Sequence, residues 1–145
     1  MVFISRSAYK KIKEYFVDLD AEQGGIIVSR NSLYYITDFI PDKTASVTAS
    51  IYSPSETIRQ RASVLEKENL IFCGIIHSHV KCSTKLSTGD REYIKQICKS
   101  NSAYPFFWFP VIRPCKNSMN LNITFNKCFL KNGELCCKAE RFFVI

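Results

Sequence analysis

The chain of 145 residues has the length of one domain, and we expect residues 1–145 to form it. With 46% hydrophobic and 23% charged residues it has the composition of a soluble globular protein, and its longest apolar stretches, Leu70–Ile76 and Pro105–Ile112, are too short to span a bilayer. The net charge of +7 comes from Lys and Arg residues scattered along the chain, so it singles out no nucleic-acid partner and would equally attract an acidic protein.

The N-terminal third predicts a helix followed by strands. Ser5 or Ser7 can cap a helix that ends near Leu19. Its apolar positions fall at helical spacing: Ala8, Ile12, Phe16 and Leu19. Two glycines, Gly24 and Gly25, and then three segments with strand character follow: Ile26–Ser29, Leu33–Ile40 and, with a weaker pattern, Val47–Tyr52.

The middle of the chain predicts a helix and a buried strand. Ser53 can cap the helix, with Pro54 in its first turn and Glu56 completing a capping box. Leu70–Ile76 is an apolar run of strand length, which indicates a strand buried on both faces.

The remainder predicts a third helix and several strands. The helix starts at Ser87 and carries Asp90 at its third position. Asn132-Gly133 is typical of a tight hairpin turn. The expected strands are Pro105–Ile112, Asn120–Phe125, Lys127–Leu130 and a last one near Leu135–Val144. The fold class is therefore α/β, with three helices around a largely β core.

Seven cysteines cannot all pair within one chain, and none of them forms a C-x-x-C pair. The N-terminus has no secretory signal, so we expect a cytoplasmic protein with free thiols that mostly fill the core. Cys82 is the exception, since it lies in the loop after the histidine pair described next. The aromatic run Phe106–Phe109 fits the core better than a surface.

The two histidines of the chain, His77 and His79, lie two residues apart at the end of the predicted buried strand. Side chains two apart on a strand point to the same face, and neutral imidazole is a preferred zinc ligand. Asp90, in the first turn of the next helix, would complete a three-ligand site. A fourth position would then stay open for water, as in catalytic zinc sites.

Each part of this pattern also has a structural interpretation. Two histidines at a strand end can be hydrogen-bonded surface groups, and Ser87 with Asp90 forms a capping box. Ser87 can combine both roles, because its oxygen can accept a bond from the helix while its proton is donated elsewhere.

Taken together, the residues resemble the JAMM motif of MPN-domain metalloproteases. That motif is His-x-His, seven residues, Ser, two residues and Asp, and here it reads His77-Ser78-His79 and then Ser87-Thr88-Gly89-Asp90. An upstream Glu belongs to the pattern, and Glu22 precedes Gly24-Gly25 as the family has it. The resemblance covers the whole chain and implies a single MPN domain of the cytidine-deaminase-like fold, a mixed curved β-sheet flanked by about three helices.

The resemblance implies a role for each motif residue. His77, His79 and Asp90 would hold one Zn²⁺ ion with a catalytic water, Glu22 would be the general base, and Ser87 would stabilise the oxyanion. Taken by itself, Glu22 can equally be a solvated carboxylate. Ser78 is expected to be a structural hydrogen-bonding residue, because no histidine is left to activate it.

The implied function is an isopeptidase or peptidase that cuts after the C-terminal tail of a ubiquitin-like protein. The compact form of the chain is similar to that of prokaryotic members of the family, which occur in conjugation and antiphage systems. The activating- and conjugating-enzyme-like proteins of such a system would be its partners, and no nucleic acid or membrane is expected to bind. The family often has proline at the position of Val80. Proline would stiffen the loop, so valine affects the rigidity of the loop but none of the expected ligands.

Other functions remain open from the sequence. The same site could trim a sulfur-carrier-type ubiquitin-like protein, or the chain could be a non-catalytic MPN scaffold. The +7 charge leaves a nucleic-acid-binding module as a further alternative.

Overall fold

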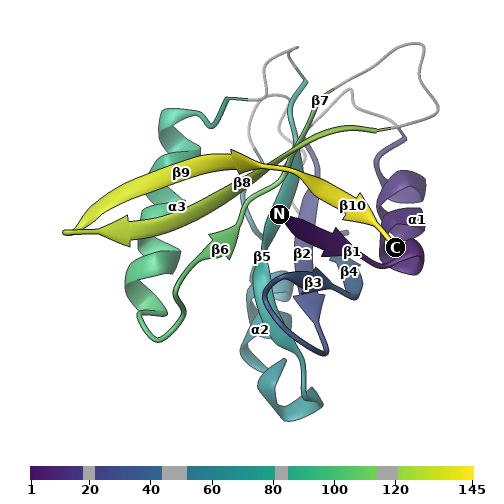
Figure 1. The fold of residues 1–145 in the computed structure, drawn as a ribbon, viewed down its shortest axis with the longest axis horizontal. Helices are drawn as coiled ribbons and strands as arrows, with labels where there is room; N and C mark the ends of the chain where they lie inside the picture. The colour runs from purple at the N-terminus through teal and green to yellow at the C-terminus, as the bar shows by residue number, and fades with distance from the viewer. Residues whose placement is uncertain (18–21, 44–51, 81–84, 114–120) are drawn as a thin grey trace.

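The computed structural model describes residues 1–17, 22–43, 52–80, 85–113 and 121–145. Within these residues the chain has three α-helices, a short 3₁₀ helix and ten strands (Figure 1). The helices are α1 (Arg6–Tyr15), α2 (Glu56–Ser63) and α3 (Thr88–Ser100), and the 3₁₀ helix is Glu66–Glu68. In the described parts of the chain, no helix is long and apolar enough to cross a membrane.

The strands form two sheets in the part of the chain that is described. A small parallel sheet has the order β10-β1-β3, and a larger sheet has the order β4-β2-β5-β6-β8-β7, with β9 paired to β8. The strands are β1 (Val2–Ile4), β2 (Gly24–Ser29), β3 (Tyr35–Ile36), β4 (Asp38–Pro41), β5 (Ile71–Ser78), β6 (Phe107–Trp108), β7 (Val111–Arg113), β8 (Asn122–Lys131), β9 (Glu134–Glu140) and β10 (Phe142–Val144). Strand β5 runs parallel to β6 and β7 but antiparallel to β2, so the larger sheet is mixed. The expected α/β class is confirmed.

The central strands of the larger sheet are buried between two apolar layers. Successive side chains of a strand point to opposite faces, and in β2 Ile27 packs on one side with α1 and the small sheet. Its neighbours Ile26 and Val28 pack on the other side with α2 and α3. Figure 1 shows α1 on the right of the molecule and α3 on the left, with the long β8–β9 hairpin crossing α3 and extending past it.

The centre of the sheet depends on a glycine. Gly74 in β5 has φ +148°, and a Cβ atom there would lie 1.6 Å from the carbonyl oxygen of Trp108 in β6. Trp108 is fully buried, and its Nε1 donates to the Leu33 carbonyl oxygen over 2.6 Å. All four residues of the aromatic run Phe106–Phe109 are buried, which confirms their expected place in the core.

The caps of α1 and α2 are serine residues, and only the first is one that the sequence predicts. Ser5 caps α1, its Oγ accepting from the Ala8 N–H over 3.1 Å, and the helix ends at Tyr15, whereas Leu19 lies outside the described residues. The prediction that Ser53 caps α2 was wrong. Ser55 is the cap, because Asp42 accepts hydrogen bonds from both its backbone and its hydroxyl and fixes the chain at that point.

Several predicted strands were divided or joined incorrectly. Leu33–Ile40 is split at Thr37 into β3 and β4, which belong to different sheets. Pro105–Ile112 is interrupted at Phe109-Pro110, where proline has no N–H for a ladder. The segments Asn120–Phe125 and Lys127–Leu130 belong, within the described residues, to one continuous strand, β8.

The end of the chain also differs from the prediction. Leu135–Val144 forms β9 and β10 with a break at Arg141, and the second of these strands pairs with β1. The Asn132-Gly133 turn is confirmed, with φ values of 53° and 78°. For Val47–Tyr52, only Tyr52 is described, and it lies in no strand.

Candidate metal centre

The end of strand β5 places both histidines on the same side of the sheet, with His77 in the strand and His79 directly after it. The His77 N–H donates to the Pro110 carbonyl oxygen over 3.1 Å, and the His79 N–H to that of Ile112 over 2.8 Å. Between them, the Ser78 N–H points the other way and donates to the Gln23 carbonyl oxygen over 2.8 Å. This alternation places both imidazoles on one face, as the spacing predicts.

The first turn of α3 brings in the carboxylate. Ser87 Oγ accepts from the Asp90 N–H over 3.0 Å, and the Ser87 N–H donates to Asp90 Oδ2 over 2.9 Å. The capping box expected from the sequence is therefore present. It fixes the rotamer of Asp90 and aims Oδ2 at the histidines.

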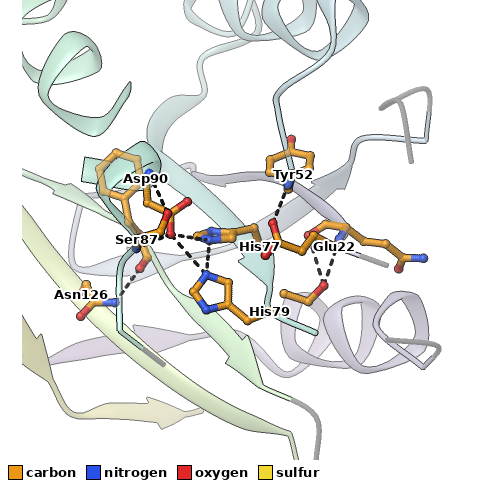
Figure 2. Close-up of polar contacts among 10 residues, drawn as sticks. Glu22, Tyr52, His77, His79, Ser87, Asp90 and Asn126 are labelled. Atoms are coloured by element: carbon orange, nitrogen blue, oxygen red, sulfur yellow. Dashed lines mark hydrogen bonds and ion pairs between the residues drawn. The ribbon is translucent and has the colours of Figure 1, made fainter. Parts of the chain in front are cut away.

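Three potential ligand atoms meet at this point (Figure 2). The two Nε2 atoms lie 2.9 Å apart, and each lies 3.3 Å from Asp90 Oδ2. Four ligands arranged tetrahedrally around zinc lie about 3.3 Å from one another, so the donor set fits such an ion. His77 is fully buried, and His79 and Asp90 are 8% and 5% exposed.

Electrostatics at the centre favour an ionised carboxylate. Burial alone would raise the pKa of Asp90, but hydrogen bonds from His77 and His79, the charge of His77 and the Ser87 backbone bond together hold that pKa well below its usual range. The imidazoles face each other through nitrogen atoms, and such a pair requires a shared proton or a cation between them. A divalent cation satisfies all three groups at once.

The ring of His77 is positioned by packing. Its Nδ1 is buried and has no hydrogen-bond partner among the described residues. The ring of Tyr52 stacks on it, with centroids 6.2 Å apart and an angle of 18° between the planes. Metal-binding histidines usually donate the N–H of their second nitrogen to a partner. Here the stacked ring of Tyr52 holds the orientation of the His77 ring instead.

Glu22 is held at the edge of the same site. Its Oε2 accepts from the Tyr52 N–H over 2.5 Å, and Gly24, two residues on, pairs in register with His77. In Figure 2, Glu22 and Tyr52 lie on one side of His77, and Asp90 and Ser87 on the other. Ser78 Oγ accepts from the Gln23 N–H over 3.0 Å, which confirms its expected structural role.

Tyr52 belongs to a buried network that the sequence did not reveal. Its hydroxyl donates to Asp42 Oδ2 over 2.9 Å, and burial, followed by the Asp42 charge, raises the pKa of this phenol far above its ordinary value. A Cβ atom on Gly24 would lie 2.5 Å from the Tyr52 ring, so only glycine leaves room for it. No sequence motif marks Tyr52 or Asp42, because the contact depends on chain segments that meet only in the fold.

A second tyrosine borders the site from α3. The Tyr93 hydroxyl is buried and has no hydrogen-bond partner among the described residues. Burial raises the pKa of Tyr93, and the charges of Asp90, Cys128 and Glu22 raise it further. No sequence motif marks Tyr93, because its place near these acidic groups depends on how α3 packs on the sheet.

The structure thus brings together the three predicted metal ligands, with Glu22 and Ser87 on either side. Ser87 is exposed, and the bond it accepts from α3 leaves its own proton available. Cys82 lies outside the described residues. A divalent cation held by these ligands would act as a Lewis acid, and with the neighbouring carboxylate and hydroxyl it would complete the groups that hydrolysis of an amide requires.

Comparison with known proteins supports the fold alone. No protein-family model and no curated protein matches the sequence. Among solved structures, the solution structure of protein DSY2949 from Desulfitobacterium hafniense is similar, with a TM-score of 0.69 at 14% sequence identity. The match covers 100% of this chain and 93% of that one.

Proposed function

We propose that the protein is a zinc-dependent peptidase or isopeptidase of the JAMM/MPN type. The observation that carries the proposal is the meeting of His77 Nε2, His79 Nε2 and Asp90 Oδ2 within 3.3 Å of one another. Two buried imidazoles whose Nε2 atoms face each other are seldom needed for the stability of a fold, whereas a metal site requires this arrangement. The mixed α/β fold is compatible with an MPN domain.

The residues of the chain divide the work of hydrolysis. His77, His79 and Asp90 would hold zinc, which supplies Lewis acidity and lowers the pKa of a water molecule to about 7. Glu22 accepts the proton of the attacking water and passes it to the leaving amine. Ser87 donates its free proton to the oxygen that gains negative charge.

The proposed substrate is the C-terminal tail of a ubiquitin-like protein, joined to a target or to a precursor extension. The motif spacing supports this substrate class through its resemblance to the JAMM family. We place the enzyme in a prokaryotic ubiquitin-like conjugation system of the antiphage kind, where activating- and conjugating-enzyme-like proteins would be its partners.

The test is a cleavage assay on a ubiquitin-like protein fused through its C-terminus to a reporter, with the metal content of each sample measured in parallel. We expect wild-type protein to cut and chelated protein to be inactive until zinc is restored. Glu22→Gln should retain zinc but lose about 10²–10⁴-fold in rate, whereas His77→Ala should lose both.

A matched control is Glu14→Gln, since Glu14 is an exposed carboxylate on α1 that pairs with Lys10. It should cut at the wild-type rate. Wild-type protein that takes up no zinc contradicts the metal site, and a Glu22→Gln variant that cuts normally contradicts the role of the base.

A further inference from the structure

The β8–β9 hairpin brings two thiols into contact away from the metal centre. Cys128 in β8 and Cys137 in β9 are cross-strand partners, and their Sγ atoms lie 2.8 Å apart. Both are free thiols in this structure. The separation is not far above the length of a disulfide bond, about 2.0 Å.

The hairpin register suits a covalent link between them. The two-residue turn Asn132-Gly133 makes Lys131 and Glu134 the closing pair, and antiparallel pairs then alternate between hydrogen-bonded and non-hydrogen-bonded. Cys128 and Cys137 therefore form a non-hydrogen-bonded pair, with Cα atoms about 4.5 Å apart. Disulfides accept Cα separations of about 4.4–6.8 Å, so the bond can form without moving the strands.

The two sulfur atoms have different surroundings. Cys128 is fully buried, whereas Cys137 is half-buried and lies in β9, which among the described strands pairs only with β8. Cys128 donates its S–H to Cys137, and this bond, with the nearby Arg91 guanidinium, lowers the pKa of Cys137. Arg91 is held there by a 3.3 Å bond from its Nη2 to the Leu135 carbonyl oxygen. The less buried of the two cysteines is thus the one favoured as a thiolate.

We propose that Cys128 and Cys137 are an oxidation site at which a hydroperoxide converts the two thiols into an intramolecular disulfide. The Cys137 thiolate attacks the O–O bond of hydrogen peroxide, which leaves sulfenic acid and hydroxide. Cys128 sulfur then attacks the Cys137 sulfur, loses its proton and displaces a second hydroxide. Two thiols and one peroxide give one disulfide and two waters, since two electrons pass from sulfur to oxygen.

The neighbouring cysteines compete for the same chemistry. Cys98 on α3 is buried in the same apolar cluster as Cys128, and Cys137 packs against that cluster. Cys136 is adjacent in sequence but pairs with Phe129, and successive strand residues point to opposite faces. The geometry therefore favours Cys128 over Cys98 and Cys136 as the partner of Cys137.

Peptide mapping tests the proposal on the unmodified full chain. Reduced protein is treated with hydrogen peroxide, remaining thiols are alkylated, and a tryptic digest is analysed by mass spectrometry. Cys128 and Cys137 fall in different tryptic peptides, 128–131 and 132–138, while Cys98 falls in 96–99. We expect loss of alkylation at both residues and a peptide that joins 128–131 to 132–138, reversed by dithiothreitol.

Variants distinguish the two cysteines in the second peptide. Cys136→Ser should retain the cross-link, and Cys137→Ser should abolish it, with circular dichroism confirming that both variants are folded. A main cross-link to Cys98 or Cys136 overturns the proposal. So does oxidation of other cysteines while Cys128 and Cys137 remain fully alkylated, or oxidation of Cys137 to sulfinic acid without any cross-link. When a variant fails to fold, fragmentation of the cross-linked wild-type peptide decides the matter, because it shows whether residue 136 or residue 137 carries the alkyl group.

Discussion

Tyr52 connects the candidate metal centre with the surrounding fold. Its backbone N–H binds Glu22, its ring stacks on His77, and its hydroxyl binds Asp42. Asp42 in turn holds Ser55, the cap of α2. The proposed base, one proposed ligand and a helix terminus therefore share a single tyrosine.

Removal of the Tyr52 hydroxyl should affect stability more than the proposed chemistry. In Tyr52→Phe the ring and the backbone N–H remain, but the 4% exposed Asp42 loses a charge-assisted bond. We expect a loss of about 1.5–3 kcal/mol in the free energy of unfolding, measured with urea, and zinc content equal to wild type.

The control for that variant is Tyr34→Phe, since Tyr34 is 48% exposed. It should change the free energy of unfolding by less than about 0.5 kcal/mol. A Tyr52→Phe variant as stable as Tyr34→Phe would contradict the structural role of the Asp42 bond.

The helix α3 has one terminus with two proposed functions. Its first turn holds Asp90 in place and exposes Ser87, so the cap of the helix lies at the proposed site. Loss of the cap and loss of the oxyanion donor can be separated, because they affect different measurements.

Ser87→Ala should lower the free energy of unfolding by about 1 kcal/mol. We expect a larger loss in kcat, about 10²–10³-fold, since an oxyanion donor is also removed. Ser87→Thr keeps a hydroxyl and should restore most of both. If the loss of kcat in Ser87→Ala is fully explained by the smaller fraction of folded protein, Ser87 acts only as a cap.

The contact between β5 and β6 depends on Gly74. Gly74→Ala would force a Cβ into the Trp108 carbonyl at an unfavourable φ, so we expect a loss of at least about 3 kcal/mol or failure to fold. Gly89→Ala is the matched control, because the nearest atom to its Cβ is Ser87 Oγ at 3.9 Å. It should be neutral or slightly stabilising in α3, as judged by thermal unfolding.

At the scale of the whole molecule, the proposed metal joins two chain segments. His77 comes from β5 in the centre of the larger sheet, His79 directly follows that strand, and Asp90 comes from the helix packed over the sheet. A cation that binds only the folded arrangement stabilises the entire chain by mass action.

Zinc should therefore raise the melting temperature. At a free concentration 100 times the dissociation constant the gain is about 2.7 kcal/mol, or on the order of 8 °C for a chain of this size. Calorimetry with zinc and with chelator measures the difference, and His77→Ala should show none. Equal melting temperatures for wild-type protein in both conditions would contradict the metal site.

Much of the site could be predicted because its members are close in sequence. His77 and His79 lie two residues apart on one strand, and Ser87 and Asp90 lie in one helical turn, so local periodicity and capping rules place them correctly. Glu22 required the family resemblance, since its place beside His77 comes from the pairing of β2 with β5.

The sequence by itself determined the α/β class, the cap at Ser87, the Asn132-Gly133 turn and the convergence of the histidines, and it narrowed the cap of the first helix to Ser5 or Ser7. These features depend on residues within about four positions of each other, where backbone geometry is periodic. Only the tertiary structure decided where the strands break, that Ser55 rather than Ser53 caps α2, that Tyr52 orients His77, and that Cys128 meets Cys137. Each of these depends on pairing or packing between separate chain segments, and local propensity does not encode which segments will meet.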